Sequence, residues 1–574
     1  MVSSVAVFVA LVLLISPALS FTPCPLLGLA YPPFRLDVND TLISNSLKNL
    51  TAKFDQLVKT NTGPNGDISP NTTFSIALFS SNKGDSGNEP FFWQYHYTSP
   101  ELSSAKNVTS SSVYRIGGLT QIFTVWSLLL IQGDRIFNDP ITKYLPALAK
   151  ASIKDTIISH TQWDEVTVGQ LASHMSGISR DYCASDLVFE KGFSEAGLPG
   201  HSSLQLPCCA NNTHCSPSDF IQHIAARIPV ALTGMTPAYS NMAFQLLGYV
   251  IEKKSGMTFE EVIQHYILNP LEMNQTSIFA PKNPVHGVIP RNRVASGWSA
   301  RTAGSEASTS MFSSARDLAI AGKAILNSTL LSSAQTRRWL KPVSHTSNPA
   351  NSIGAPWIIY SGGDYPDTSM VDVYSILSNE GNNEGLYSSY LGLVPDYSVG
   401  FAILSADTVS PADLNAHADY MEVMLEAVME TALKQAAKNF GGAYVASGLN
   451  SSITVMWDGL PGLYIEDFVS NGINFRETLA TLTHVANATD LSIRLYPTER
   501  VETDNQGSKQ AFRGVLQDKT ELADAGTPTC VSWMDLDKLR YGEYGLDEFI
   551  FNLNAEGQAV SVEIPALEMT LVKK

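Results

Sequence analysis

The sequence has few charged residues, and the basic ones are outnumbered by the acidic ones. Charged side chains make up 16% of the 574 residues, and 37 Lys and Arg stand against 54 Asp and Glu, a net charge of −17. The chain has no basic run, which argues against nucleic acid and anionic membranes as partners. Apolar residues reach 44%, so intrinsic disorder is excluded as the main state. The length predicts more than one domain, at about 100–200 residues each.

Long apolar runs are absent except at the start of the chain. Val5 to Ile15 is unbroken, Pro17 ends the run, and Ala18-Leu19-Ser20 precedes a predicted cut at Phe21. We expect residues 1–20 to be a secretory signal peptide. A membrane anchor is the alternative, but the run is shorter than the roughly 20 residues that a spanning helix needs. The sequence therefore predicts a secreted protein without membrane association after signal removal.

A set of glycosylation sequons agrees with secretion. Nine Asn-x-Ser/Thr sequons are spread along the chain, at Asn39, Asn49, Asn71, Asn107, Asn211, Asn274, Asn327, Asn450 and Asn487. Single sequons arise by chance, but nine are typical of an exported glycoprotein. We expect N-glycosylation.

Cysteine is scarce, with six residues in the chain. Four of them, Cys183, Cys208, Cys209 and Cys215, are close in sequence and predict one disulfide-stapled insertion. A zinc site is the alternative, but no C-x-x-C pair or H-x-x-x-H spacing supports it. A bond between Cys24 and Cys530, joining the two ends, is a further hypothesis. We expect no metal and no cofactor.

The distribution of predicted elements divides the chain after the signal into three zones. Residues 21–110 hold a polar lead-in and then two strands, at 74–80 and 91–97. Residues 111–440 mix helices and strands, and a long helix over 416–438 closes this zone. Residues 441–574 carry short alternating strands, which predict a separate all-β domain, either a sandwich or a small barrel.

Several common catalytic motifs are missing. The chain has no G-x-G-x-x-G, Walker loop, H-E-x-x-H or G-x-S-x-G, and its 11 His residues show no metal-ligand spacing. Nucleotide-binding, zinc-protease and nucleophile-elbow functions therefore lack support.

The motifs that are present lie in one order along the chain. Residues 114–134 begin Tyr-Arg-Ile-Gly-Gly-Leu-Thr-Gln, enter an apolar helix and end in Gly-Asp. The later ones are WDEVTVGQLASHMSGISRDY at 163–182, Pro-Ala-Tyr-Ser-Asn at 237–241, Ser-Ser-Ala-Arg-Asp-Leu at 313–318 and the strand pair at 387–404. Together they resemble the serine β-lactamase and penicillin-binding-protein superfamily, and within it the class C and esterase-like branch that includes secreted fungal β-lactamase-like proteins.

The resemblance implies an α+β fold. Its expected architecture is a β-lactamase/transpeptidase-like antiparallel sheet flanked by helices, with a helical lobe, followed by the small all-β C-terminal domain. Family members acylate the serine of an S-x-x-K motif, whose lysine helps to remove the serine proton.

This chain departs from the family at the reactive positions. Gly118 stands at the serine position and Gln121 at the lysine position, while the third motif reads Asn379-Glu380-Gly381 instead of K-x-G or H-x-G. Glycine has no hydroxyl to acylate, and an amide is no base near neutral pH. Deleting the nucleophile of a serine hydrolase costs on the order of 10⁶ in rate.

Other hydroxyls are poor replacements. Thr120 follows the serine position by two residues and, at about 200° around the helix, should face elsewhere. Ser80 and Ser103 each begin an S-x-x-K string, but both strings lie in turn-rich stretches that we expect at the surface and not at the start of a buried helix. Ser240 lies inside the second motif, without a base that the sequence identifies.

What remains is a polar site without a nucleophile. The resemblance assigns Gly118 an oxyanion-hole amide, which needs no side chain. We expect Tyr239 to be catalytic through proton transfer. The expected binding residues are Gly118, Gln121, Asn241, Asn379, Glu380 and Gly381. The structural alternative is that Tyr239 and Asn241 merely hold a loop and that Glu380 is solvated.

Three functions follow from these positions. The first is an enzyme that changes a small natural product by non-covalent acid/base chemistry, as in secondary metabolism. The second is a catalytically inactive binding or partner protein. The third is a serine-type esterase or hydrolase with an unforeseen nucleophile. The sequence names a small molecule as the partner and leaves the oligomeric state open.

Overall fold

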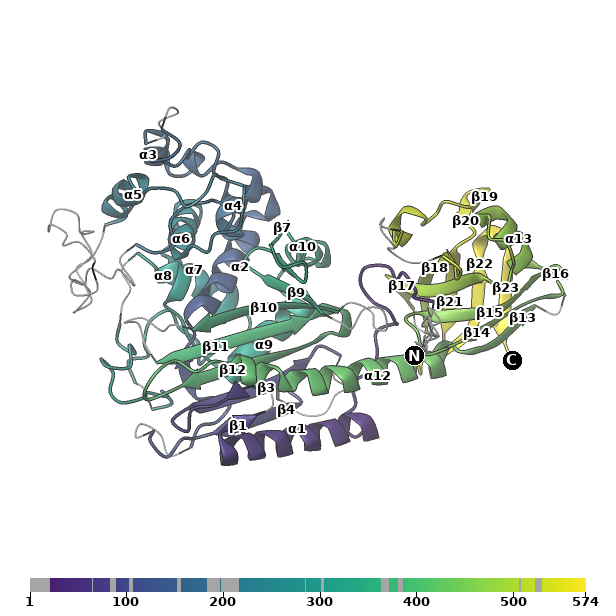
Figure 1. Cartoon of the computed structure of the whole chain (residues 1–574), viewed down its shortest axis with the longest axis horizontal. Helices are drawn as coiled ribbons and strands as arrows, with labels where there is room; N and C mark the ends of the chain where they lie inside the picture. Colours follow the sequence, from purple (N-terminus) through teal and green to yellow (C-terminus); the bar gives the residue numbers. More distant parts are fainter. Residues whose placement is uncertain are drawn as a thin grey trace, which may run out of the picture. The chain divides into compact units, whose positions relative to one another are not determined.

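The computed structural model divides the chain into two compact units (Figure 1). It describes residues 21–574 except 64–65, 83–88, 103–106, 152–155, 183–196, 198–215, 284, 301–303, 363–370, 380–385, 447, 505–506 and 522–528. The larger unit comprises residues 33–362 and 370–432, and the smaller one contains residues 433–574 together with the chain start up to residue 32. Cys183, Cys208, Cys209 and Cys215 lie outside the described residues, so the predicted insertion stays a prediction.

An eight-stranded antiparallel sheet forms the centre of the larger unit. Its strand order is β4-β3-β12-β11-β10-β9-β8-β7. These strands are β3 (Thr73–Ser80), β4 (Trp93–Tyr97), β7 (Ser344–His345), β8 (Asn351–Ile353), β9 (Ile358–Gly362), β10 (Val371–Asn379), β11 (Tyr387–Val394) and β12 (Val399–Ala406). The strands expected at 74–80 and 387–404 are confirmed.

Alternating side chains of β3 enter two different cores. Phe74, Ile76 and Leu78 belong to one apolar cluster, while Ala77 and Phe79 belong to another. Because successive side chains of a strand point to opposite faces, the sheet is buried on both sides. The first core includes residues of α1 (Thr41–Thr60) and α12 (Tyr420–Phe440), and the second includes α9 (Ala315–Leu326). In Figure 1, α1 and α12 lie on one side of this sheet and the helical lobe on the other.

The polar lead-in is a correction to the sequence analysis, because much of it is the helix α1. Asp40 caps this helix by accepting from the N–H of Leu42 at 2.9 Å. Leu50, Phe54 and Leu57 recur at helical spacing and are buried. The polar residues between them are the solvated face of an amphipathic helix. The long helix expected at 416–438 is also interrupted, at Asp419 between α11 (Asn415–Ala418) and α12.

The helical lobe contains the helices that carry the motifs. It includes α2 (Thr120–Gln132), α4 (Val168–Ala172), α6 (Asn241–Ser255) and α7 (Phe259–Ile263), and further short helices are α3 (Pro146–Ala149), α5 (Pro217–Ala225), α8 (Glu306–Thr309) and α10 (Ser333–Trp339). α2 is buried over its first ten residues. Its sequence carries no charged residue, which suits such a central position. The α+β fold class is thereby confirmed.

The smaller unit is a closed antiparallel barrel, which decides between the two expected architectures. Its nine-stranded sheet runs β14-β13-β23-β22-β21-β18-β17-β15-β16, and a further β14–β15 pairing closes the ring, leaving β16 outside it. The strands are β13 (Gly442–Ala446), β14 (Ser451–Met456), β15 (Leu463–Ser470), β16 (Ile473–Asn474), β17 (Leu491–Thr503), β18 (Ser508–Asp518), β21 (Glu548–Leu553), β22 (Ala559–Ile564) and β23 (Met569–Lys573). The helix α13 (Phe475–Thr483) and the last residues of α12 belong to the same unit.

The first described residues, 21–32, belong to this barrel unit. The sequence analysis grouped them in one zone, 21–110, with the strands at 74–80 and 91–97, which lie in the larger unit. A disulfide joins Cys24 to Cys530, as hypothesised. The Cys24 N–H donates to Gln517 at 3.0 Å, and the Tyr31 hydroxyl donates to the Leu460 carbonyl at 3.1 Å. These contacts hold residues 24–31 on the barrel. The sequence analysis had grouped them with the strands that follow them in the chain.

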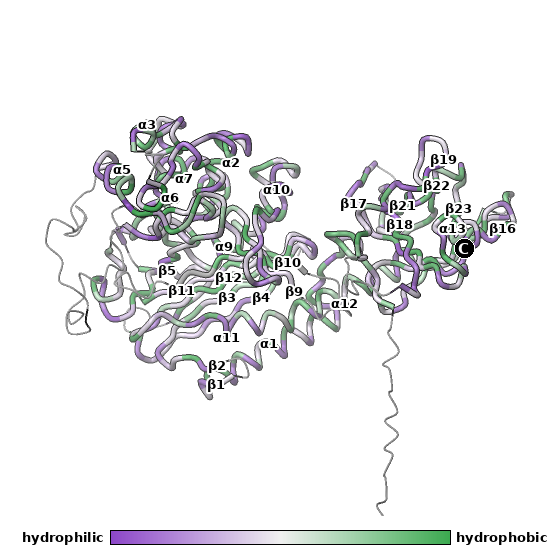
Figure 2. The backbone as a smooth tube through the Cα atoms, turned by 45° about the horizontal axis from the view of Figure 1, so that its top comes forward, coloured by the Kyte–Doolittle hydropathy of each residue, from purple (hydrophilic) through white to green (hydrophobic). Residues whose placement is uncertain are grey.

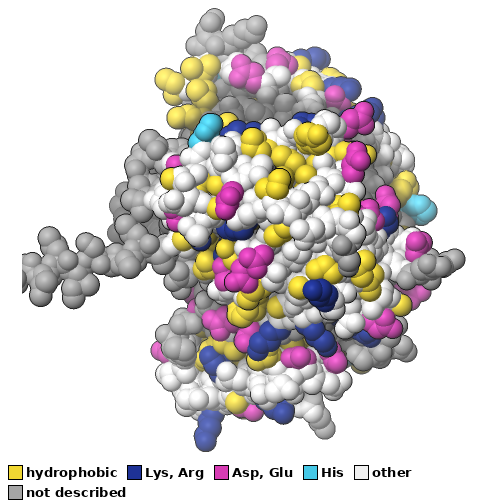
Figure 3. Space-filling view, turned by 90° about the vertical axis from the view of Figure 1, so that its right-hand side faces the viewer, with side chains coloured by type: hydrophobic (Ala, Val, Ile, Leu, Met, Phe, Trp, Pro, Cys, Tyr) yellow, Lys and Arg dark blue, Asp and Glu magenta, His cyan; other side chains and the backbone are white. Residues whose placement is uncertain are grey.

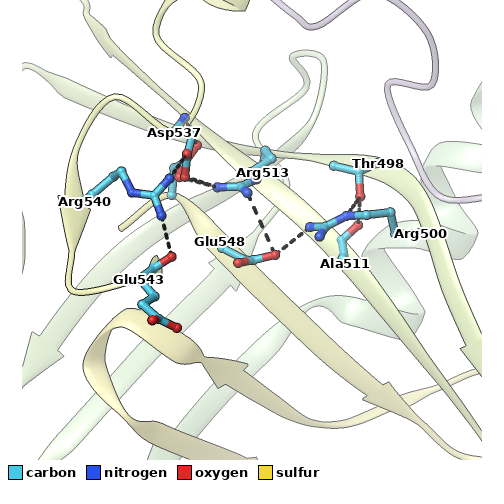
Figure 4. Close-up of polar contacts among 9 residues, drawn as sticks. Thr498, Arg500, Ala511, Arg513, Asp537, Arg540, Glu543 and Glu548 are labelled. Atoms are coloured by element: carbon cyan, nitrogen blue, oxygen red, sulfur yellow. Dashed lines mark hydrogen bonds and ion pairs between the residues drawn. The ribbon is translucent and has the colours of Figure 1, made fainter. Parts of the chain in front are cut away.

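An ion-pair cluster lies on the barrel (Figure 4). Arg513 contacts the carboxylates of Asp547 at 2.7 Å and Asp537 at 3.4 Å, and Arg500 contacts Glu548 at 2.6 Å. Asp547 and Glu548 are buried. Buried charges need such partners, so the cluster has a structural role in the barrel.

The surface carries both charge signs. On the face in Figure 3, acidic and basic side chains are interspersed with apolar ones. Figure 2 shows the sheet strands as mostly hydrophobic, while hydrophilic stretches are common in the outer helices and loops. Within the described residues, every helix is too short or too polar to cross a membrane.

Candidate functional site

The turn at the serine position is fixed by backbone contacts. Ile116 precedes the 3₁₀ turn Gly117–Leu119, and its carbonyl accepts a hydrogen bond from Ser389 of β11 at 2.7 Å. Gly117 has φ of 47°, a left-handed conformation that favours glycine. Gly118 does not share this conformation, so a side chain at position 118 meets no such backbone restriction.

Gln121 occupies the centre of a hydrogen-bonded cluster. Its side-chain Nε2 donates to the Tyr239 hydroxyl at 2.8 Å, to Ser308 Oγ at 3.1 Å and to Asn241 Oδ1 at 3.2 Å. The side chain is 1% exposed. An ammonium has three hydrogens for three acceptors, whereas an amide has two. A neutral donor therefore stands where the family places a cation.

Ser308, on α8, is a member of the cluster that the sequence reasoning missed. Its hydroxyl donates to Asn241 Oδ1 at 2.6 Å and accepts from Gln121. A second contact brings α8 to α2, because Thr124 donates to the Ala307 carbonyl at 2.6 Å. The only signal was its position five residues before the Ser313 motif, which names no partner.

Tyr239 and Asn241 lie on either side of a helix cap. Ser240 is the N-cap of α6, where its hydroxyl accepts from the N–H of Ala243 at 3.1 Å and donates to the Ser179 carbonyl at 2.7 Å. Asn241 is buried, whereas Tyr239 is 37% exposed. The structure thus brings three predicted residues together and exposes the phenol of one of them.

His174 supports this turn as a neutral side chain. Its ring stacks on Tyr239 with centroids 4.6 Å apart, and its Nδ1 accepts from the N–H of Ser240 at 3.2 Å. Burial, with a smaller contribution from the nearby Arg180 cation, lowers the pKa of His174 to about 3. A histidine with so low a pKa is no base for a hydroxyl near neutral pH.

Arg180 and Asp181 form the outer layer of the cluster, and sequence reasoning did not select them. Asp181 accepts from the Asn241 side-chain amide at 2.7 Å and pairs with Arg180 Nε at 3.2 Å. The Arg180 guanidinium lies over the Tyr239 ring, 4.7 Å from its centroid. The site therefore has a cation, but it is beside the phenol and not in the third motif.

The third motif is only partly described. Asn379 is the last residue of β10, and its backbone pairs with Ser388 of β11. Glu380 and Gly381 lie outside the described residues. Their predicted binding roles stay predictions.

The aliphatic hydroxyls that contact this cluster, among the described residues, donate to neutral oxygens. Thr120 donates to the Gly117 carbonyl at 2.7 Å, Ser308 donates to Asn241, and Ser240 donates to the Ser179 carbonyl. Ser80 of β3 likewise donates to the Ser398 carbonyl at 3.1 Å, while Lys83, Ser103 and Lys106 are outside the described residues. A nucleophile needs a base at its proton, and these contacts provide none.

Metal-binding groups are not part of this arrangement. In the portion of the chain that the structure describes, no three His, Cys, Asp or Glu side chains gather as a metal site would require. The groups of the cluster are the amides of Gln121 and Asn241, the Tyr239 phenol, the Ser308 hydroxyl, and the Asp181–Arg180 pair.

Comparisons with known proteins agree with the order of motifs. A family model described as "Beta-lactamase" matches residues 87–425. The chain belongs to the beta-lactamase family. A second model, "Beta-lactamase-like-like, C-terminal domain", matches residues 432–574, which form the barrel.

Three relatives of this beta-lactamase family member match it over most of both chains. A "Beta-lactamase-like protein" of Arthroderma benhamiae is 27% identical over 93% of both chains. "Probable hydrolase M10" of a Phoma species is 22% identical, covering 84% of this chain and 82% of the relative. "Probable hydrolase clz13" of Cochliobolus lunatus is 23% identical with the same coverage.

Solved structures similar to this family member were also found. A class C beta-lactamase has 15% identity and a TM-score of 0.48, with 68% of this chain and 98% of that one covered. The octameric penicillin-binding protein homologue from Pyrococcus abyssi has 18% identity and a TM-score of 0.47, with 83% and 97% covered.

Proposed function

We propose that this beta-lactamase family member binds a small carbonyl compound at the Gln121 cluster and changes it without forming an acyl-enzyme. The carrying observation is the contact of Gln121 Nε2 with Tyr239, Ser308 and Asn241. A neutral amide holds the lysine position, and Gly118 precedes it without a hydroxyl. Two relatives are described as probable hydrolases, which supports an enzymatic role at this site.

Tyr239 is the proton-transfer residue in this proposal. Its oxygen accepts from Gln121, and in the proposal its hydroxyl donates to the carbonyl oxygen of a ligand. The resemblance implies a further donor to the same oxygen, the backbone N–H of Gly118 near the start of α2. Polarising a carbonyl in this way supports proton transfer or rearrangement and needs no covalent step.

The proposal includes secretion and glycosylation. It is supported by the apolar run at Val5 to Ile15, by the nine sequons and by the Cys24–Cys530 disulfide. Disulfides persist in oxidising compartments. A natural product met outside the cytoplasm is the ligand class that follows.

Reversible binding of a β-lactam tests this function. Purified glycosylated protein and a Tyr239→Phe variant would be titrated with benzylpenicillin by ligand-observed NMR, and intact masses would be recorded afterwards. We expect saturable binding with unchanged mass, weakened about fivefold or more by the variant, since one hydrogen bond contributes about 1 kcal/mol. Lys253→Ala, an exposed change on α6, is the control. A covalent adduct, or equal binding by Tyr239→Phe, would contradict the proposal.

A further inference from the structure

The position of the Arg180 side chain is set by the same turn that carries Tyr239. The Arg180 carbonyl accepts from the N–H groups of Asn241 at 2.9 Å and Met242 at 3.3 Å. The guanidinium then lies 4.7 Å from the centroid of the Tyr239 ring. These bonds hold the Arg180 backbone at the first turn of α6, and the pair of Nε with Asp181 orients its side chain beside the phenol.

The terminal nitrogens of Arg180 are available to a ligand. The side chain is 68% exposed, and its one ion pair within the described residues runs from Nε to Asp181 Oδ2. Asp181 is itself engaged on its other oxygen, by the Asn241 amide at 2.7 Å. Nη1 and Nη2 make no hydrogen bond or ion pair with any described residue. A guanidinium presents such donors as a fork that fits a carboxylate.

Arg180 is also the cation of the site among the residues that the structure describes there. Gln121 is neutral, His174 is neutral because burial lowers its pKa to about 3, and the third motif Asn379-Glu380-Gly381 contains no basic residue. Any anionic group of a ligand at Tyr239 therefore finds its opposite charge at Arg180.

A row of exposed apolar side chains begins beside Arg180. Ile228, Val230, Leu232 and Met235, here called the apolar ridge, are 65%, 65%, 53% and 73% exposed. Residues 228–230 of this ridge lie beside residues 177–179, which directly precede Arg180. The Ser179 hydroxyl donates to the Ile228 carbonyl at 3.0 Å, and the N–H of Val230 donates to the Gly177 carbonyl at 2.8 Å. Four exposed apolar side chains within eight residues are more than the isolated ones that an ordinary surface carries.

We propose that Arg180 binds the carboxylate of an apolar carboxylic acid whose hydrocarbon part lies along the apolar ridge. The carboxylate then neighbours the Tyr239 hydroxyl, where the proposed chemistry takes place. This inference rests on the proposed function for the location of the ligand. It adds the ligand class and the residues that select it.

Titration of the full glycosylated chain with decanoate, decanol and butyrate tests the charge contact. We expect wild-type protein to bind decanoate at least tenfold more tightly than decanol. Hydrogen bonds to charged groups contribute more free energy than neutral ones, and the difference corresponds to about tenfold in affinity. Arg180→Gln should remove this difference, and Arg180→Lys should retain part of it. Arg337→Gln, an exposed change on α10, is the matched control. Thermal melting of each variant verifies folding.

The ridge is tested with Val230→Ser/Leu232→Ser. This variant should weaken decanoate binding about tenfold and leave butyrate binding unchanged. Equal decanoate affinities of wild type and Arg180→Gln would overturn the inference, as would failure of wild type to bind decanoate. The two proposals fail separately: a benzylpenicillin adduct contradicts the proposed function, whereas the decanoate series decides the role of Arg180.

Discussion

At the scale of single residues, Gln121 holds the site together. Its amide is buried and contacts three side chains from two other helices and the turn before one of them. Gln121→Met keeps the volume but removes the donor, so a buried oxygen of Asn241 loses one partner. We expect the free energy of unfolding to fall by about 1–3 kcal/mol, measured by urea denaturation. Gln132→Met, at the end of the same helix and less buried, should cost less; equal losses would contradict a central role for Gln121.

His174 makes the larger unit sensitive to acid. Burial lowers its pKa to about 3, whereas an unfolded histidine titrates near about 6.5. The unfolded state therefore binds one more proton between these values, and stability is lost as pH falls below about 6.5, by about 1.4 kcal/mol per pH unit. His417, whose pKa burial lowers to about 4, adds the same sign.

A stability profile between pH 7 and 4 isolates this effect. His174→Asn retains an acceptor for the Ser240 N–H and suits the positive φ of 58°. The free energy of unfolding of this variant, measured with urea, should fall less steeply as the pH is lowered than that of wild type. The reason is that the variant takes up one proton fewer on unfolding. His265→Asn, at an exposed position, should follow wild type. Parallel profiles of wild type and His174→Asn would show that His174 is not the responsible group.

The motif positions predicted part of the cluster, but the side chains that contact those positions were not predicted. Gln121, Tyr239 and Asn241 follow from the family pattern, and the structure brings them within hydrogen-bond distance. Ser308 and Arg180 were missed because their contacts cross between helices and turns, which spacing along the chain does not encode. Arg180 lies inside the segment 163–182, but the sequence does not show that its guanidinium lies over the Tyr239 ring.

At the scale of elements, close packing of α6 against α8 positions Ser308. A Cβ added at Gly248 of α6 would lie 2.8 Å from the Ala307 Cβ. Alanine gains about 1 kcal/mol over glycine in a helix, but overpacking costs about 1–3 kcal/mol. We expect Gly248→Ala to be neutral to destabilising in thermal melting, and Gly248→Val to lower stability further. An increase in melting temperature for Gly248→Val would contradict this tight contact.

Most strand and helix positions could be predicted from the sequence. The exceptions are α1 and the closure of the barrel. The alternation over 74–80 and the apolar run in α2 predict their elements directly. α1 was read as a lead-in because its exposed polar residues outnumber the buried ones that define its face. Barrel closure was undecided because the β14–β15 pairing joins strands whose register no local pattern fixes.

At the scale of the whole molecule, one covalent bond joins residues 506 positions apart. Cys24 and Cys530 both belong to the barrel unit, so their bond holds the chain start to it. The double variant Cys24→Ser/Cys530→Ser should lose about 2–5 kcal/mol of stability, since the link restricts the unfolded chain. Calorimetry without reductant should show the barrel transition lowered and the larger unit's transition retained. A barrel transition at the wild-type temperature would contradict this role.

The central claim is a beta-lactamase family site without acyl-enzyme chemistry, and intact mass spectrometry tests it most directly. Wild-type protein, Gly118→Ser and Gly118→Ser/Gln121→Lys would each be incubated with a reactive β-lactam and an activated ester. We predict an unchanged wild-type mass, little adduct on the single variant, and one acyl group on the introduced serine of the double variant. Position 118 lacks the positive φ that favours glycine, and the lysine restores the base. A stoichiometric adduct on the wild-type protein would contradict the account and would locate a nucleophile elsewhere in the chain.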